Sequence, residues 1–308
     1  MGKVAFVFPG QGAQAVGMGK DVYEKSSLAK EFFDRASEAV GLDLKALCFE
    51  ENEDIHITEF TQVCLLTTSV ALLREIEARG GKADIAGGLS LGEYCALVAN
   101  GAMDGIEAAK VVRKRGIFMQ EEVPAGEGGM AAIMGLEAEK IEEAIAGYDK
   151  VQIANYNCPG QIVISGETEQ VKEAADKLKE AGARKTVLLK VSGPFHSKLL
   201  AGAGDKLATE LESVTISPMR FPYVANVTGG IVTDEAEIKS LLVKQLSNSV
   251  RWQQCVESMV KDGVDTFYEI GPGKTLAGFN RKIAKDMGRE LTTVQIATME
   301  DIENNFSN

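Results

Sequence analysis

The stretch Ala86–Ala102, AGGLSLGEYCALVANGA, contains the pattern on which our interpretation of the fold depends. Its centre, Gly88-Leu89-Ser90-Leu91-Gly92, is a G-x-S-x-G pentapeptide between a short apolar segment and a helix predicted for Glu93–Asn100. A serine at a sharp strand-to-helix turn adopts strained backbone angles, so its hydroxyl projects beyond the sheet edge. The flanking glycines leave room for the adjacent strand and helix. Because the pattern also occurs by chance, a plain turn with a helix-capping serine is the alternative.

The N-terminal run Val4–Phe8 predicts a strand buried on both faces of a parallel sheet. Pro9-Gly10-Gln11-Gly12 follows at its carboxyl end, where open α/β sheets bind their ligands. Gln11 stands between two glycines, and its backbone N–H is therefore expected to be free to face a ligand.

Helical patterns dominate the next part of the chain. Helices are predicted for Ser27–Val40, for the long apolar segment Thr58–Arg79 and, after the capping pattern Asp104-x-x-Glu107, for a segment ending near Glu122. Arg115 lies on the last of these helices, where an inward orientation is one possibility and a solvated face is the other.

A different rhythm begins after residues 123–128 and gives the order β-α-β-β-α-β, which is that of a ferredoxin-like unit. The predicted elements are strand Gly129–Met134, helix Glu137–Gly147, strands Val151–Asn155 and Gln161–Ser165, helix Thr168–Ala181 and strand Lys185–Val191. Alternating strands and helices then resume, with strands at Tyr223–Asn226, Thr266–Ile270 and Leu291–Ile296 and helices from Asp234, at Trp252–Lys261 and at Lys274–Asp286. We therefore expect an α/β protein whose large, α/β-hydrolase-like domain with a parallel sheet core comprises residues 1–124 and 194–308. Residues 125–193 are expected to form an inserted ferredoxin-like subdomain.

Composition excludes several classes of protein. The 308 residues are 45% hydrophobic and 25% charged, with a net charge of −12. This acidity argues against nucleic acid or an anionic membrane surface as a partner. No apolar run approaches the roughly 18–20 residues of a membrane span, and the N-terminal run is too short for a signal peptide. Five scattered cysteines and two histidines argue against a metal site and predict a cytoplasmic protein with reduced thiols.

His196 is the histidine that follows the Ser90 motif, in Gly193-Pro194-Phe195-His196-Ser197. A lone histidine is more often structural than catalytic. His196 lies where the chain leaves the predicted insertion, beside the start of a helix. The serine at the elbow of this chain needs a base, which favours a catalytic role. The other histidine, His56, lies in an acidic loop-like segment that favours a surface position.

Taken together, these motifs strongly resemble the malonyl-CoA:acyl-carrier-protein transacylases of fatty acid synthesis and the acyltransferase domains of polyketide synthases. The matching segments are Phe8–Gly12, Gly88–Tyr94, Arg115-Gly116 with Met119-Gln120, Asn155–Gln161, Gly193–His196 and Tyr268–Gly273. Leu89 departs from the family, many of whose members have histidine before the serine. That histidine is not the base, so the departure concerns packing or hydrogen bonding behind the elbow.

The resemblance implies a role for each matching residue. Ser90 is the nucleophile, His196 the base, and the backbone N–H groups of Gln11 and Leu91 form the oxyanion hole. Arg115 binds the malonyl carboxylate, and a backbone carbonyl near Gln245, or Asn248, holds the histidine. The remaining residues expected to bind substrate are Met119, Phe195, Asn155 and Asn157. Phe195 resembles the residue of malonyl-selecting polyketide acyltransferases.

The implied reaction moves a malonyl group from malonyl-CoA to the phosphopantetheine thiol of acyl carrier protein, without any cofactor and with ping-pong kinetics. We expect a monomer. A serine esterase or thioesterase using the same Ser/His pair, a malonyltransferase of a polyketide pathway and a non-catalytic docking protein are the alternatives. Arg115 argues against the hydrolase, because an esterase for neutral acyl groups has no use for a carboxylate-binding arginine.

Overall fold

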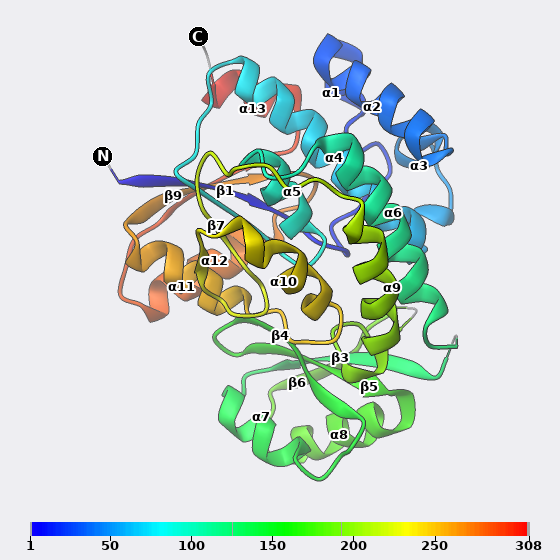
Figure 1. The fold of residues 1–308 in the computed structure, drawn as a ribbon. Coiled ribbons are helices and arrows are strands. Elements are labelled where there is room, and N and C mark those ends of the chain that lie inside the picture. The colour runs from blue at the N-terminus through cyan, green and yellow to red at the C-terminus, as the bar shows by residue number, and fades with distance from the viewer. Residues whose placement is uncertain (1, 125, 192, 307–308) are drawn as a thin grey trace.

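The computed structural model describes residues 2–124, 126–191 and 193–306, which form two sheets with helices packed around them (Figure 1). Residue 125, the predicted first residue of the insertion, lies outside the described residues. The strands are β1 (Lys3–Phe8), β2 (Ile85–Gly88), β3 (Gly128–Met134), β4 (Val151–Cys158), β5 (Gln161–Glu167), β6 (Lys185–Leu188), β7 (Tyr223–Val224), β8 (Ile231–Val232), β9 (Val264–Ile270) and β10 (Thr292–Ile296).

The helices lie around both sheets. They are α1 (Lys20–Lys25), α2 (Ser27–Val40), α3 (Leu44–Phe49), α4 (Thr58–Ala78), α5 (Gly92–Ala99), α6 (Gly105–Glu121), α7 (Ala138–Ile145), α8 (Thr168–Glu180), α9 (Ala201–Glu212), α10 (Ile238–Gln245), α11 (Trp252–Lys261), α12 (Thr275–Asp286) and α13 (Met299–Asn305). Among the described residues, no helix combines the length and the apolar character that crossing a membrane requires.

The larger sheet has the strand order β10-β9-β1-β2-β7-β8. Its strands are parallel except for β8, which pairs with β7 in the antiparallel sense. Strand β1 lies between β9 and β2, and its residues Ala5, Phe6, Val7 and Phe8 are almost fully buried. The predicted strand buried on both faces is therefore confirmed.

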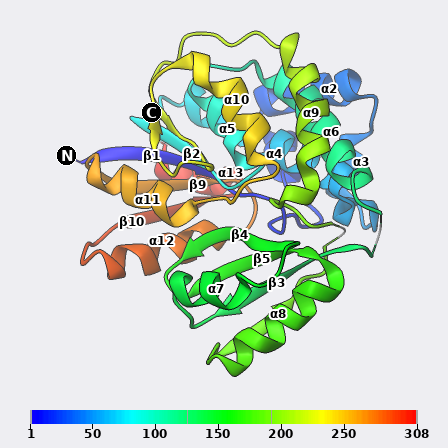
Figure 2. The same ribbon diagram turned by 60° about the horizontal axis from the view of Figure 1, so that its bottom comes forward.

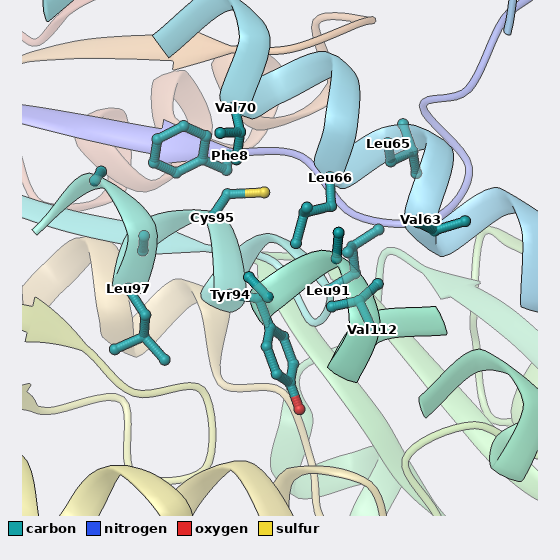
Figure 3. Close-up of a cluster of buried hydrophobic side chains, with 14 of the residues drawn as sticks. Phe8, Val63, Leu65, Leu66, Val70, Leu91, Tyr94, Cys95, Leu97 and Val112 are labelled. Carbon is teal, nitrogen blue, oxygen red and sulfur yellow. The ribbon is translucent and has the colours of Figure 1, made fainter. Parts of the chain in front are cut away.

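Helices cover both faces of this sheet. Figure 2 shows α4, α5 and α10 on one side of it and α11 and α12 on the other. Helix α4 is buried along most of its length, because it packs against α2, α5 and α6 as well as the sheet. Its residues Val63, Leu66 and Val70 join Phe8 and Leu91 in one apolar cluster (Figure 3). The predicted central position of this helix is confirmed, and the cluster gives the serine turn a rigid base.

The smaller sheet contains β3 to β6 in the order β4-β5-β3-β6, with every neighbouring pair antiparallel. Helices α7 and α8 cover the face turned away from the larger sheet (Figures 1 and 2). This order and connectivity are those of the expected ferredoxin-like unit. The boundaries that we assign to the insertion stay a prediction.

A backbone contact joins the smaller sheet to the larger unit. The Tyr156 N–H of β4 donates to the Val250 carbonyl at 2.9 Å, and the Val250 N–H donates to the Ala154 carbonyl at 2.8 Å. These two hydrogen bonds form a short parallel bridge between β4 and the segment before α11. The smaller sheet is thus fixed to the larger unit close to the residues of the candidate site.

Candidate active site

Ser90 lies at the junction between β2 and α5 in a left-handed conformation, with φ of 54°. A Cβ on Gly88 would collide with the Gly92 backbone, and a Cβ on Gly92 would collide with the Phe8 carbonyl. Both glycines are therefore needed for the turn to close, and the predicted strained elbow is confirmed. Among the described residues, the only other non-glycine residue with positive φ is His196, at 58°. Such strain clusters at functional sites.

The histidine ring reaches the serine hydroxyl. The His196 Nε2 atom lies 2.8 Å from Ser90 Oγ, and its Nδ1 atom lies 2.8 Å from the Gln245 main-chain carbonyl. Because a carbonyl can only accept, Nδ1 carries the proton and Nε2 presents its lone pair to the hydroxyl. Burial, and then the nearby Arg115 charge, lower the pKa of His196 to about 4. The ring is thus neutral near pH 7 and able to accept a proton.

The two residues predicted to hold the histidine differ in their contacts. Gln245 supplies the carbonyl that accepts from Nδ1. The Asn248 side chain instead donates to the carbonyl of Lys244, in the last turn of α10, at 2.7 Å. Asn248 acts on the ring only through its backbone, which raises the pKa of His196 slightly against the effect of burial.

Arg115 enters the site from α6 and is fully buried, so of the two orientations that the helix pattern left open the side chain adopts the inward one. Its Nη2 atom donates to Ser90 Oγ at 3.1 Å and to Gln245 Oε1 at 2.8 Å, while Nη1 donates to Gln62 Oε1 at 2.5 Å. Among the described residues, its Nε atom has no partner. A buried guanidinium whose hydrogen bonds go to neutral oxygens keeps its charge available to an anion.

Two residues beside Ser90 have backbone N–H groups without a protein acceptor in the part of the chain that the structure describes. Among the described residues, no protein acceptor takes the backbone N–H of Gln11 or of Leu91. Leu91 precedes α5, and Gln11 follows β1, so both donors lie at the carboxyl edge of the larger sheet. Free donors at this edge fit an oxyanion forming beside Ser90.

These groups meet in a cavity of about 200 Å³ between the two sheets. The cavity is lined by Gly10, Gln11, Gln62, Leu89, Ser90, Leu91, Arg115, Met119, Met130, Asn155, Asn157, Val163, Leu189, Val191, Phe195, His196, Thr275 and Phe279. The structure thus brings together every residue that we expected to contact substrate. By contrast, His56 is exposed, as predicted. In the described ranges, no group of His, Cys, Asp and Glu side chains could hold a metal ion.

Comparisons with known proteins place this geometry in a family. The acyl transferase domain model matches residues 5–302. A malonyl CoA-acyl carrier protein transacylase from Bacillus subtilis is 44% identical over 98% of this chain and 96% of its own length. The chain belongs to the malonyl CoA-acyl carrier protein transacylase family.

Solved structures of the family agree with the fold. The enzyme from Clostridium perfringens, also named malonyl CoA-acyl carrier protein transacylase, superposes with a TM-score of 0.93 at 42% identity, covering 98% of this chain and 95% of that one. A malonyl-transacylase in complex with its type II PKS acyl-carrier protein gives 0.94 at 39% identity, covering 99% of both chains. The resemblance stated from the sequence motifs is therefore confirmed.

Several residues beside the transacylase pocket escaped the sequence analysis. Gln62 of α4 holds the Arg115 guanidinium, and the Asn226 side chain accepts from the Ser90 N–H at 2.6 Å and donates to the Gly88 carbonyl at 2.7 Å. Gln152 of β4 donates to the His196 carbonyl at 3.0 Å. Gln62 and Asn226 are buried and Gln152 is half-buried, and only their contacts in the fold distinguish them from ordinary surface amides.

Proposed function

We propose that this protein transfers the malonyl group of malonyl-CoA to the phosphopantetheine thiol of acyl carrier protein, through a malonyl ester on Ser90, as a step of fatty acid biosynthesis. One observation carries the proposal: the same Ser90 Oγ lies 2.8 Å from a histidine Nε2 and 3.1 Å from a buried arginine Nη2. The first contact supplies a base, and the second supplies a cation where a substrate carboxylate would lie.

In the first half-reaction, Ser90 Oγ attacks the thioester carbonyl carbon while its proton moves to His196 Nε2. The tetrahedral intermediate collapses, the C–S bond breaks, and the CoA sulfur leaves with the proton from His196. In the second half-reaction, His196 takes the proton of the carrier thiol, whose sulfur attacks the ester carbonyl. The Ser90 oxygen then leaves and regains a proton from His196, and the enzyme returns to its starting state.

The oxyanion of each intermediate is bound by the backbone N–H groups of Gln11 and Leu91. Both residues line the cavity beside Ser90, and donors held in place by the backbone need little reorganisation during the reaction. Loss of one such donor typically costs about 10²–10³ in rate.

Arg115 provides the selectivity for an acyl group with a free carboxylate. A guanidinium matches a carboxylate through two parallel hydrogen bonds, which an ammonium cannot reproduce. Gln62 and Gln245 hold the guanidinium plane without neutralising it. In an esterase for neutral acyl groups, burying this cation would cost desolvation free energy and no substrate carboxylate would offset it. The buried arginine therefore favours the transferase over the hydrolase.

Phe195, Met119, Asn155 and Asn157 complete the substrate site. Phe195 is 6% exposed and Met119 is 2% exposed, and both line the cavity. A ring at this wall leaves little space for an α-methyl branch, so we predict that malonyl-CoA is turned over much faster than methylmalonyl-CoA. Comparable kcat/KM values for the two CoA esters would contradict this prediction.

The carrier protein and CoA are both acidic, so a local basic surface must oppose the chain's overall charge. Two exposed groups of cations are the candidates: Arg281, Lys282 and Lys285 on α12, and Arg184, Lys185 and Lys190 around β6. Charge reversal in the docking group should raise the carrier-protein KM and leave the malonyl-CoA KM unchanged.

We propose that the enzyme acts as a monomer and works in the cytoplasm without a cofactor. Every residue of the site comes from one chain, and the malonyl, CoA and carrier groups supply all the atoms of the reaction. All five cysteines are buried free thiols, which fits a reducing compartment.

The deciding experiment measures intact-protein mass after brief incubation with malonyl-CoA, and again after adding phosphopantetheinylated carrier protein. We expect a gain of one malonyl group that is absent from Ser90→Ala and passes to the carrier. Decay of the adduct at the same rate with and without carrier would indicate a hydrolase. Absence of an adduct would indicate a docking protein.

A further inference from the structure

Glu93 is a buried carboxylate that the mechanism above does not use. It lies in the first turn of α5, three residues after Ser90, and is 1% exposed. Its Oε2 atom accepts from Gln245 Nε2 at 2.7 Å and from the Asn226 backbone N–H at 3.1 Å. Among the described residues, Oε1 has no hydrogen-bond partner. Because a protonated carboxyl would need an acceptor for its O–H, these contacts fit the ionised form.

The Gln245 amide separates this carboxylate from the Arg115 guanidinium. Its Oε1 atom accepts from Arg115 at 2.8 Å, and its Nε2 atom donates to Glu93 at 2.7 Å. The negative end of the amide dipole therefore faces the cation and the positive end faces the anion. An amide turned by half a rotation would place its oxygen against the carboxylate and its NH₂ group against the guanidinium. The two charges together thus allow one orientation of the amide.

The same Gln245 contacts the reacting residues. Its Nε2 atom also donates to the Ser90 carbonyl at 3.0 Å, and its own carbonyl accepts from the His196 ring. Asn226, whose N–H is held by Glu93, accepts from the Ser90 N–H. The nucleophile, the base and the guanidinium are therefore all oriented by groups that Glu93 holds in place.

We propose that ionised Glu93 is a positioning residue that fixes the Gln245 amide and so holds the Arg115 guanidinium ready for the substrate carboxylate; this inference rests on the malonyl transfer proposed above. A direct Glu–Arg ion pair would neutralise the guanidinium, and the substrate would have to displace it. With the amide between them, the Glu93 carboxylate balances the buried guanidinium charge at a distance, and Arg115 has no direct carboxylate partner among the described residues. Selectivity for an acidic acyl group then depends on a residue that does not touch the substrate.

The charge of Glu93 changes within an accessible pH range. Burial raises the pKa of Glu93 to about 7, against the opposing effects of its two hydrogen-bond donors and Arg115. The other groups that face it are Tyr94 of α5, Tyr223 of β7 and Cys255 of α11, and burial raises the pKa of each of these above its ordinary value. These three groups stay neutral as the pH falls through 7, so Glu93 is the group in this set that gains a proton.

The test compares malonyl-CoA with acetyl-CoA, which has no free carboxylate, as acyl donors to Ser90. Both donors use the same serine and histidine, so the ratio of their kcat/KM values cancels the titration of His196. In the wild type we expect this ratio to fall about tenfold or more between about pH 8 and about pH 5.5. In Glu93→Gln we expect a ratio about 10–100-fold lower at about pH 8, with little dependence on pH.

Matched variants separate charge from shape. Glu169→Gln makes the same chemical change at a side chain that is 71% exposed, and it should follow the wild type. Glu93→Asp retains the carboxylate and should recover part of the ratio and its pH dependence. A merely structural role for Glu93 would lower both kcat/KM values together and leave their ratio unchanged.

A wild-type ratio in folded Glu93→Gln would overturn the inference, as would loss of both activities in equal proportion. If Glu93→Gln does not fold, the wild-type ratio decides, because a ratio that stays flat across this pH range would also overturn it. Failure of the wild type to form any malonyl adduct would overturn the proposed function and this inference together. Malonylation of the wild type with an unchanged ratio in the variant overturns the inference alone.

Discussion

Ser90 and His196 adopt similar left-handed backbone angles, but different parts of the molecule hold them there. Ser90 lies at a strand-to-helix junction, and the glycines two residues away on each side allow the turn. His196 lies in a connecting segment, where Gln152 of the smaller sheet binds its carbonyl and also accepts from the Lys198 N–H at 3.0 Å. The strain at Ser90, the proposed nucleophile, is therefore specified within a few residues of sequence, whereas the strain at His196, the proposed base, depends on a second sheet.

Gln245 contacts both residues: its side chain donates to the Ser90 carbonyl, and its main-chain carbonyl accepts from the His196 ring. A change beside Ser90 can thus be compared with a change beside His196, with malonyl transfer as the common readout.

Removing the base should have the largest effect. His196→Ala leaves the Ser90 elbow intact but removes the proton acceptor, so we expect kcat for malonyl transfer to fall about 10²–10⁴-fold. Stopped-flow acylation with malonyl-CoA measures this change. Retention of wild-type acylation would show that another group accepts the proton.

Obstructing the turn at Ser90 should have the next largest effect. In Gly88→Ala the new Cβ meets the Gly92 backbone, which cannot move without displacing α5, so we expect unfolding to become easier by about 3 kcal/mol. Urea denaturation measures the change. Gly278→Ala is the matched control, because its Cβ would meet nothing within 4 Å, and alanine in this helix should stabilise by about 1 kcal/mol. Equal stability of the two variants would contradict the local origin of the Ser90 strain.

The buried histidine should also make stability depend on pH. Its folded-state pKa, about 4, lies below its ordinary value, so the unfolded chain binds the proton first as the pH falls. The contribution of neutral His196 is complete above about pH 6.5 and is lost as the pH approaches 4. Relative to His196→Gln, in which the other titrating groups cancel, the wild type should lose about 2 kcal/mol of unfolding free energy between about pH 7 and about pH 5. A constant difference between the two proteins would show that the ring is accessible to protons.

Releasing the histidine turn from the smaller sheet should have the smallest effect. Gln152→Leu removes the donor to the His196 carbonyl while keeping a side chain of similar size, and we expect kcat to fall about tenfold. The KM for malonyl-CoA should stay near its wild-type value, because Gln152 does not line the cavity. A rise in KM without a change in kcat would indicate that Gln152 orders the pocket wall and leaves the base undisturbed.

The same difference explains what the sequence could predict. The elbow, the buried β1 strand and the long helix α4 follow from local patterns, and the structure agrees with each. The strand predicted to end at Val191 stops at Leu188, and the strand predicted for Tyr223–Asn226 ends at Val224. Such ends depend on where a partner strand stops, which single-sequence patterns do not record.

The candidate site divides in the same way. Ser90 follows from a motif, whereas the roles of His196 and Arg115 required the family resemblance as well as the residues. Gln62, Gln152 and Asn226 could not be found, because their partners lie 44 or more positions away in the chain. An amide beside an apolar run does not show by itself whether it will be buried against a guanidinium, a carbonyl or solvent.

The bridge between β4 and Val250 has a mechanical consequence for substrate entry. Its two backbone hydrogen bonds hold the smaller sheet to the larger unit near Ser90 and His196. Moving the smaller sheet away from the larger unit would break both bonds at once. Each is worth about 1 kcal/mol net, and more while its ends are shielded from water. The pantetheine arm is thin enough to enter a pocket whose width does not change. The two sheets therefore hold the pocket at a fixed width, and the residues inside it select the acyl group.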